Sequence, residues 1–132
     1  MGKIVIDTSA VIAVVANEPA KPAIIRLTEG MELVAPAALH WEIANAFSAL
    51  FKKRCLSLSK SVEFFNAYRQ IPIRFADIDA IAAMRLAYQL DIYAYDAYFL
   101  ECALREKAPL MTLDGGLLTS AKKIGVSVKE IT

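Results

Sequence analysis

The sequence has few of the residues that mark zinc sites and disulfide-linked proteins, with two cysteines and one histidine in 132 residues. Cys55 and Cys102 lie far apart, without CxxC spacing or a nearby histidine, which argues against structural zinc. Both fall in helix-like segments, where free cysteines are usually buried, so we expect reduced thiols. The lone histidine, His40, is interpreted as a surface residue of a helix.

Long apolar runs are also absent, and no stretch approaches the 18 or so residues of a membrane span. Near the N-terminus an apolar run ends at Asp7 after only three residues, and no cleavage pattern follows. A signal peptide is therefore not expected, and a cytoplasmic location is predicted by default.

Neither positive nor negative charge predominates, because the formal net charge is +1. The chain therefore has no strong basic field to attract nucleic acid over a distance. Contact with a phosphate backbone would have to come from local clusters, Lys52-Lys53-Arg54 or Lys122-Lys123. Such runs are also typical of solvated helix ends.

Hydrophobic residues make up 57% of the chain, and the mean hydropathy is +0.42. A sheet buried on both faces would explain these values, and so would apolar surface kept for a partner; we expect both. Repeats, linkers and low-complexity segments are absent, which indicates a single domain over residues 1–132.

Short β-branched runs alternate with longer helical patterns along the chain. This alternation predicts a parallel sheet with helices on both faces. Strands are expected at residues 3–6, 32–35, 73–75, 110–113 and 126–129, and helices at 23–29, 37–54, 59–70, 79–90, 96–106 and 114–124.

In such a sheet, ligands bind beyond the carboxyl ends of the strands. Asp7 directly follows the first strand, and Asp114 follows the fourth. An aspartate at a strand-to-helix turn is a common N-cap. Capping alone therefore explains either residue when it is taken by itself.

Two further acids are less easily explained. Asp96 begins the apolar stripe of its helix and is expected to point toward the core, although a cap could still account for it. Glu42 lies inside a helix at the edge of an apolar face, where it cannot act as a cap. If buried, its carboxylate must be paired, protonated or bound to a cation. The alternative is a packed stem with the carboxylate in solvent.

Taken together, Asp7, Glu42, Asp96 and Asp114 can meet in one cleft. Close carboxylates repel one another, and a divalent cation makes such a cluster stable. Ligation by oxygen alone favours Mg²⁺ or Mn²⁺. Water activated by such an ion can hydrolyse a phosphodiester bond.

Hydroxyl groups flank these acids in the sequence, on Thr8, Ser9 and Thr112. They could orient water or a phosphate oxygen, or serve only as caps and strand-end residues. A metal-free ribonuclease mechanism with paired histidines is excluded, because the chain has one imidazole.

The segments that carry the four acids resemble the PIN domain, in particular VapC-type toxins of bacterial and archaeal toxin–antitoxin pairs. Residues 4–10 resemble the opening strand with the first acid, and residues 41–46 resemble the helix with the second. Residues 95–103 and 110–114 resemble the segments of the third and fourth acids. The four segments occur in the family's order and span nearly the whole chain.

This resemblance implies a three-layer α/β/α fold with a central, mostly parallel sheet. It also implies Mg²⁺- or Mn²⁺-dependent endoribonuclease activity at the four acids, with an RNA substrate, homodimerisation and inhibition by a cognate antitoxin. Gly115 and Gly116 stand where many relatives carry a basic residue, and their backbone N–H groups could take its place. Trp41, opposite the core face of its helix, is expected either to mark a dimer or antitoxin surface or to pack under the helix at 59–70.

Other functions fit less well. A receiver domain needs paired acids after its first strand and a lysine after its last, which Ile6-Asp7 and residues 126–128 do not supply. An aspartyl-nucleophile phosphatase needs an aspartate where Ser9 stands. A catalytically silent PIN-like module that binds nucleic acid or protein remains the alternative, although such modules usually lose acids.

Overall fold

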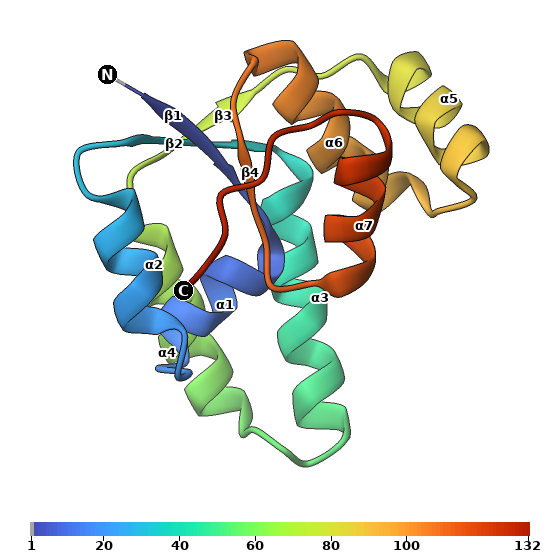
Figure 1. Cartoon of the computed structure of the whole chain (residues 1–132). Coiled ribbons are helices and arrows are strands. Elements are labelled where there is room, and N and C mark those ends of the chain that lie inside the picture. Colours follow the sequence, from blue (N-terminus) through green and yellow to red (C-terminus); the bar gives the residue numbers. More distant parts are fainter. Residues whose placement is uncertain (1) are drawn as a thin grey trace.

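The computed structural model describes residues 2–132, which form a four-stranded parallel sheet in the order β3-β2-β1-β4. Helices cover both faces of this sheet (Figure 1). The predicted three-layer α/β/α fold is confirmed. The strands are β1 (Lys3–Ile6), β2 (Glu32–Pro36), β3 (Ile73–Ala76) and β4 (Leu110–Met111). The helices are α1 (Thr8–Val15), α2 (Lys21–Thr28), α3 (Ala38–Lys52), α4 (Leu58–Arg69), α5 (Ala80–Leu90), α6 (Ala94–Glu106) and α7 (Gly115–Lys123).

The central strand β1 determines where the site lies. Val5 is aligned with Val34 on one side and with Leu110 on the other, and all three side chains are fully buried. Burial on both faces explains why these strands are continuous apolar runs rather than alternating ones. Because Ile6 is aligned with Met111, the residues that follow β1 and β4 emerge side by side at the carboxyl edge.

Side-chain caps begin several helices, as the sequence predicts. The carboxylate of Asp7 accepts the N–H of Ala10 at the start of α1, and Asp79 caps α5 in the same way. The helix predicted at 96–106 begins earlier, at Ala94, after an N-cap residue whose side chain does not cap the helix. Asp96 therefore lies inside the first turn of α6 and does not cap it.

Two further predictions are wrong. The strand expected at 126–129 is reduced to one parallel bridge between Leu110 and Val128, because β4 is only two residues long and offers little edge to pair with. Cys102 is buried as expected, but Cys55 is exposed in the connection between α3 and α4, and both thiols are free. Across residues 2–132, none of the helices has the length and apolar character needed to cross a membrane.

Candidate active site

Asp7 is the most firmly held of the four acids. It follows β1 directly and is only 4% exposed. Its Oδ1 accepts hydrogen bonds from the hydroxyl of Ser9 (2.7 Å) and the N–H of Ala10 (3.1 Å), and its Oδ2 accepts one from Thr112 (2.5 Å). Burial raises the pKa of Asp7, and these hydrogen bonds oppose that rise. The carboxylate is thus fixed in orientation by the ends of two strands.

The two hydroxyl groups beside Asp7 also organise the segment after β4. Thr112 accepts the N–H of Asp114 at 2.9 Å, and Ser9 accepts the N–H of Leu113 at 2.9 Å. The two hydroxyl oxygens lie 3.3 Å apart. Ser9 and Thr112, which the sequence leaves open as caps or site residues, therefore connect the β1 end to the β4 end around Asp7.

Asp114 is exposed and acts as the N-cap of α7. Its Oδ1 accepts the N–H groups of Gly116 (2.8 Å) and Leu117 (3.2 Å). The N–H of Gly116 is consequently occupied within the protein and cannot replace a basic side chain at a phosphate. The capping interpretation of Asp114 is correct, and its second carboxylate oxygen is not used by the cap.

Glu42 is a mid-helix carboxylate of α3 that partly faces the protein interior. Its Oε2 is buried and makes no hydrogen bond within the described part of the chain. Burial raises the pKa of Glu42 to about 7, and the charges of Asp96 and Asp7 add to the rise. The carboxylate therefore does not extend entirely into solvent, because one of its two oxygens is buried and the residue as a whole is half-buried.

Asp96 completes the group from the first turn of α6. Its carboxyl is half-buried, and burial together with the charge of Asp114 raises its pKa. The charge of Asp114 also raises the pKa of Asp7. Each of the four acids is therefore within electrostatic range of at least two others, at the edge where β1 and β4 end.

The donor chemistry of this site suits a hard divalent cation, because all four side chains offer carboxylate oxygens. Glu42 Oε2 is buried and has no hydrogen-bond partner in the described part of the chain, which fits such an ion, since an unsatisfied carboxylate oxygen is costly to bury. Within residues 2–132, no three acidic, histidine or cysteine side chains already lie close enough to share one ion. Rotation of side chains is therefore needed to bring the carboxylates onto a common ion.

A cavity of about 380 Å³ opens beside Glu42 and is lined by residues from α1, α3 and α6. Thr8 contributes a buried hydroxyl that has no hydrogen-bond partner among the described residues. The sequence interpretation missed Asn45 and Tyr95 in this lining. Asn45 lies three residues after Glu42, on the same side of the helix, and Tyr95 directly precedes Asp96, so spacing alone could have suggested both.

Trp41 also lines this cavity and is 70% exposed. It does not pack under α4, so that expectation is wrong. His40 occupies that position: its ring contacts Phe65 and Tyr68 of α4, and Nδ1 lies 3.4 Å from the Tyr68 hydroxyl. His40 is thus half-buried rather than a free surface residue.

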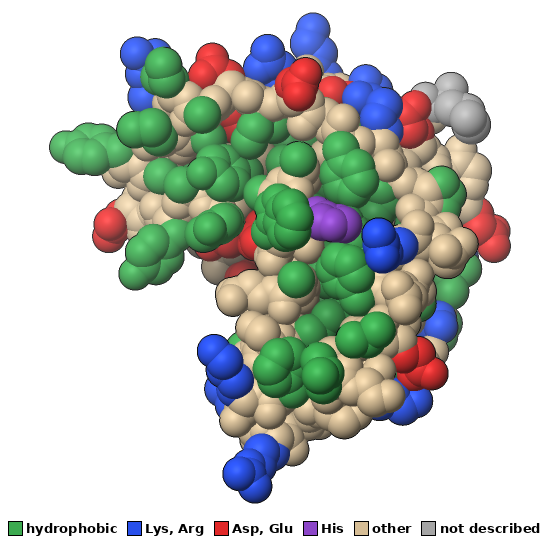
Figure 2. Space-filling model, turned by 180° about the vertical axis from the view of Figure 1, so that it is seen from behind, with side chains coloured by type: hydrophobic (Ala, Val, Ile, Leu, Met, Phe, Trp, Pro, Cys, Tyr) green, Lys and Arg blue, Asp and Glu red, His purple; other side chains and the backbone are tan. Residues whose placement is uncertain are grey.

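Figure 2 shows a deep indentation on one face of the molecule. Acidic side chains lie at its inner edge, and hydrophobic side chains cover the surface beside it. Lys and Arg side chains stand along its lower border. The surface therefore combines an acidic cleft with exposed apolar side chains and only scattered positive charge.

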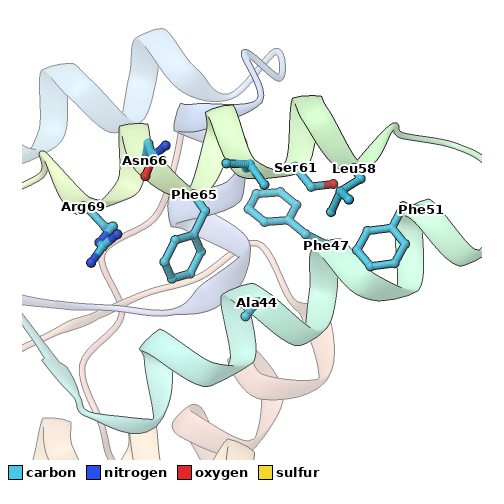
Figure 3. Close-up of a pocket in the computed structure, with 9 residues that line it drawn as sticks. Ala44, Phe47, Phe51, Leu58, Ser61, Phe65, Asn66 and Arg69 are labelled. Atoms are coloured by element: carbon cyan, nitrogen blue, oxygen red, sulfur yellow. The ribbon is translucent and has the colours of Figure 1, made fainter.

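A second cavity, of about 270 Å³, lies between α3 and α4 and has a different character (Figure 3). Phenylalanine side chains from both helices point into it, and Arg69 lies at one end. It contains no carboxylate. Hydrolytic chemistry based on acids therefore belongs to the cleft at the sheet edge and not to this apolar groove.

The chain is thus a three-layer α/β/α protein with a parallel sheet and an acidic cleft at the carboxyl edge of that sheet. The PIN domain profile matches residues 4–123, so the chain belongs to the PIN domain family. PIN domains are generally nucleases, which gives the chain a nuclease role.

Solved structures share this fold at low sequence identity. PAE2754 from Pyrobaculum aerophilum matches with a TM-score of 0.71 and 18% identity, over 90% of this chain and 79% of that one. VapBC2 from Rickettsia felis, solved bound to a promoter DNA fragment, matches with a TM-score of 0.69 and 14% identity, over 96% of this chain and 97% of that one. FitAcB from Neisseria gonorrhoeae matches with a TM-score of 0.54 and 18% identity, over 96% of each chain. Curated protein sequences show no significant match to this chain.

Proposed function

We propose that this protein is a divalent-metal-dependent endoribonuclease and the toxin of a toxin–antitoxin pair. The observation that supports this most directly is Glu42, whose buried Oε2 has no hydrogen-bond partner within residues 2–132 and whose pKa is raised by burial and by the charges of Asp96 and Asp7. Removing such a group from water costs several kcal/mol unless a cation or a proton compensates it. A divalent cation bound in this cleft would offset part of the mutual repulsion of the acids.

The residues proposed to hold the ion are Asp7, Glu42, Asp96 and Asp114. A bound Mg²⁺ or Mn²⁺ supplies positive charge for a phosphodiester oxygen and lowers the pKa of water. Thr112 and Ser9 keep the Asp7 carboxylate in one orientation, and the cap of α7 holds Asp114 near it.

The proposed partner is a small antitoxin, and the likeness to VapBC2 and FitAcB supports this. Homodimerisation and a cytoplasmic location belong to the same proposal. The high hydrophobic content of the chain is consistent with apolar surface kept for a protein partner.

A cleavage assay on a structured RNA tests the nuclease proposal. We expect cleavage with Mg²⁺ or Mn²⁺, none in EDTA, and products with a 5′-phosphate and a 3′-hydroxyl. Asp7→Asn should be inactive but folded. A 2′,3′-cyclic phosphate product, or cleavage undiminished by EDTA, contradicts the metal-dependent mechanism, and RNA binding without cleavage identifies a catalytically silent module.

Co-expression with any small protein that is encoded next to this gene tests the toxin proposal separately. The expected result is a stable complex in which cleavage is suppressed. An active monomer that no such partner inhibits contradicts the toxin assignment and leaves the nuclease assignment intact.

A further inference from the structure

The cavity beside Glu42 is bordered by two exposed aromatic side chains from different helices. Trp41 of α3 is 70% exposed and Tyr95 of α6 is 59% exposed, and both line the cavity that contains Glu42 and Thr8. Large aromatic side chains are usually buried at least in part because water solvates their faces poorly. Two that remain exposed at the mouth of one cavity therefore indicate a ligand with flat apolar surfaces.

Each ring is held in place by an aromatic neighbour on its own helix. Trp41 packs edge-to-face on His40, with ring centroids 4.9 Å apart and an interplanar angle of 88°. Tyr95 packs on Tyr98 in the same way, at 5.8 Å and 82°. Restricting the rings before binding lowers the entropy lost on binding. Most of the indole surface of Trp41 remains open to solvent despite this contact.

We propose that Trp41 and Tyr95 stack on unpaired bases of single-stranded RNA beside the acidic cleft. This inference rests on the proposed ribonuclease function and specifies its substrate class. Base faces are accessible in single-stranded loops and ends, whereas in a duplex they are covered by neighbouring base pairs. The amide of Asn45, in the same lining, can hydrogen-bond to base edges but does not select one base by itself.

Stacking also answers an electrostatic difficulty of this site. The chain has a net charge of only +1, and acidic residues gather where the phosphate must approach. Attraction between basic side chains and phosphates is therefore weaker than in most nucleic-acid-binding proteins. Aromatic stacking does not depend on charge and is tolerant of sequence, so it provides affinity that the charge distribution does not.

Trp41 is the only tryptophan, so indole fluorescence reports directly on the proposed contact. The full-length Asp7→Asn variant in Mg²⁺ is titrated with a short unstructured RNA oligonucleotide and with the corresponding duplex. We expect quenching by the single strand and little change with the duplex. Absence of quenching, or equal quenching by the duplex, overturns the proposal.

Variants in the Asp7→Asn background are then compared by the anisotropy of end-labelled RNA. Trp41→Ala and Tyr95→Ala are each expected to weaken binding about tenfold, and Trp41→Phe and Tyr95→Phe by less than about threefold. Tyr88→Ala is the matched control, because Tyr88 is 91% exposed and lies outside the cavity lining; it should bind like the parent protein. Thermal melting confirms that each variant folds.

The other occupant of such a surface would be a protein. If Trp41→Ala leaves RNA affinity unchanged but alters the oligomeric state or the binding of a partner protein, these side chains belong to a protein interface and the proposal fails. Stacking-dependent RNA binding by a wild-type protein that does not cleave RNA would instead contradict the proposed function and leave the stacking site standing.

Discussion

The hydroxyl group of Thr112 lies 2.5 Å from Oδ2 of Asp7 and donates a hydrogen bond to it. The hydroxyl oxygen of Thr112 also accepts the backbone N–H of Asp114 at 2.9 Å. Because Thr112 follows β4 and Asp7 follows β1, one side chain positions two of the proposed metal ligands relative to each other. The parallel pairing of these two strands brings the residues together from opposite ends of the sequence.

Replacing Thr112 by valine is expected to impair cleavage without removing an acid. Thr112→Val keeps the volume but leaves Asp7 Oδ2 without its donor and the Asp114 N–H without its acceptor. Loss of a residue that orients a metal ligand typically lowers metal affinity or activity about 10–100-fold. Initial rates measured over a range of Mg²⁺ concentrations should show this loss, together with a destabilisation of about 1–3 kcal/mol.

The hydroxyl itself can be isolated with two further variants. Thr112→Ser keeps the donor and should retain most of the activity. Thr119→Val is the matched control, because Thr119 is exposed and its hydroxyl donates to the carbonyl oxygen of Gly115 within α7, away from the acids. Wild-type cleavage by Thr112→Val would show that Asp7 does not need this hydrogen bond.

Two substitutions at Asp114 separate its cap from its proposed role in the site. Asparagine caps a helix about as well as aspartate, so Asp114→Asn should be nearly as stable as the wild type, whereas Asp114→Ala should lose about 1 kcal/mol. Both should lose cleavage by about 100-fold or more, because neither retains the charge proposed to hold a cation. Normal cleavage by Asp114→Asn would restrict Asp114 to capping.

The raised pKa of Glu42, about 7 against an ordinary 4.5, predicts how the metal-free protein responds to pH. Between these values the folded protein holds a proton that the unfolded chain has released, so the free energy of unfolding falls as the pH rises. The decrease in the free energy of unfolding is complete once the pH exceeds the pKa of Glu42 in the folded protein. Glu42→Gln cannot ionise, so it should flatten this part of the profile and exceed the wild type in stability at about pH 8.

Denaturant unfolding in EDTA at several pH values measures this difference. Glu29→Gln, at an exposed position, is the control and should follow the wild-type profile. Added Mg²⁺ should stabilise the wild type in alkaline solution more than Glu42→Gln, because a ligand of the folded state raises its stability. Parallel profiles for the wild type and Glu42→Gln would contradict the buried, proton-binding state of Glu42.

The sequence predicted the alternation of strands and helices because burial on both faces produces continuous apolar runs. It overestimated β4, which stops at Met111; Thr112 then hydrogen-bonds to Asp7 and to the Asp114 N–H instead of continuing the strand. It also placed the start of α6 at Asp96, because aspartate is a favoured cap. The helix begins at Ala94 without a side-chain cap, which local patterns do not reveal.

The candidate site residues were predicted mainly from their positions within or after secondary-structure elements. Glu42 was recognisable because it lies mid-helix, where capping is excluded, and Asp7 and Asp114 because they follow strands. The surroundings of His40 could not be predicted, since they depend on how α4 packs on α3. Spacing from Glu42 and Asp96 could have suggested Asn45 and Tyr95, but that both line one cavity depends on how α3 and α6 lie relative to each other.

Asp96 and Asp79 provide a last comparison between two aspartates near helix starts. The Asp79 carboxylate accepts N–H groups of Ile81 and Ala82, whereas burial and the charge of Asp114 raise the pKa of Asp96. Asp96→Asn should therefore lose cleavage about 100-fold or more and keep its stability in EDTA, because it removes a repulsive charge. Asp79→Asn preserves a cap and should cleave normally; equal loss in both variants would mean that general destabilisation, not a charge in the cleft, limits activity.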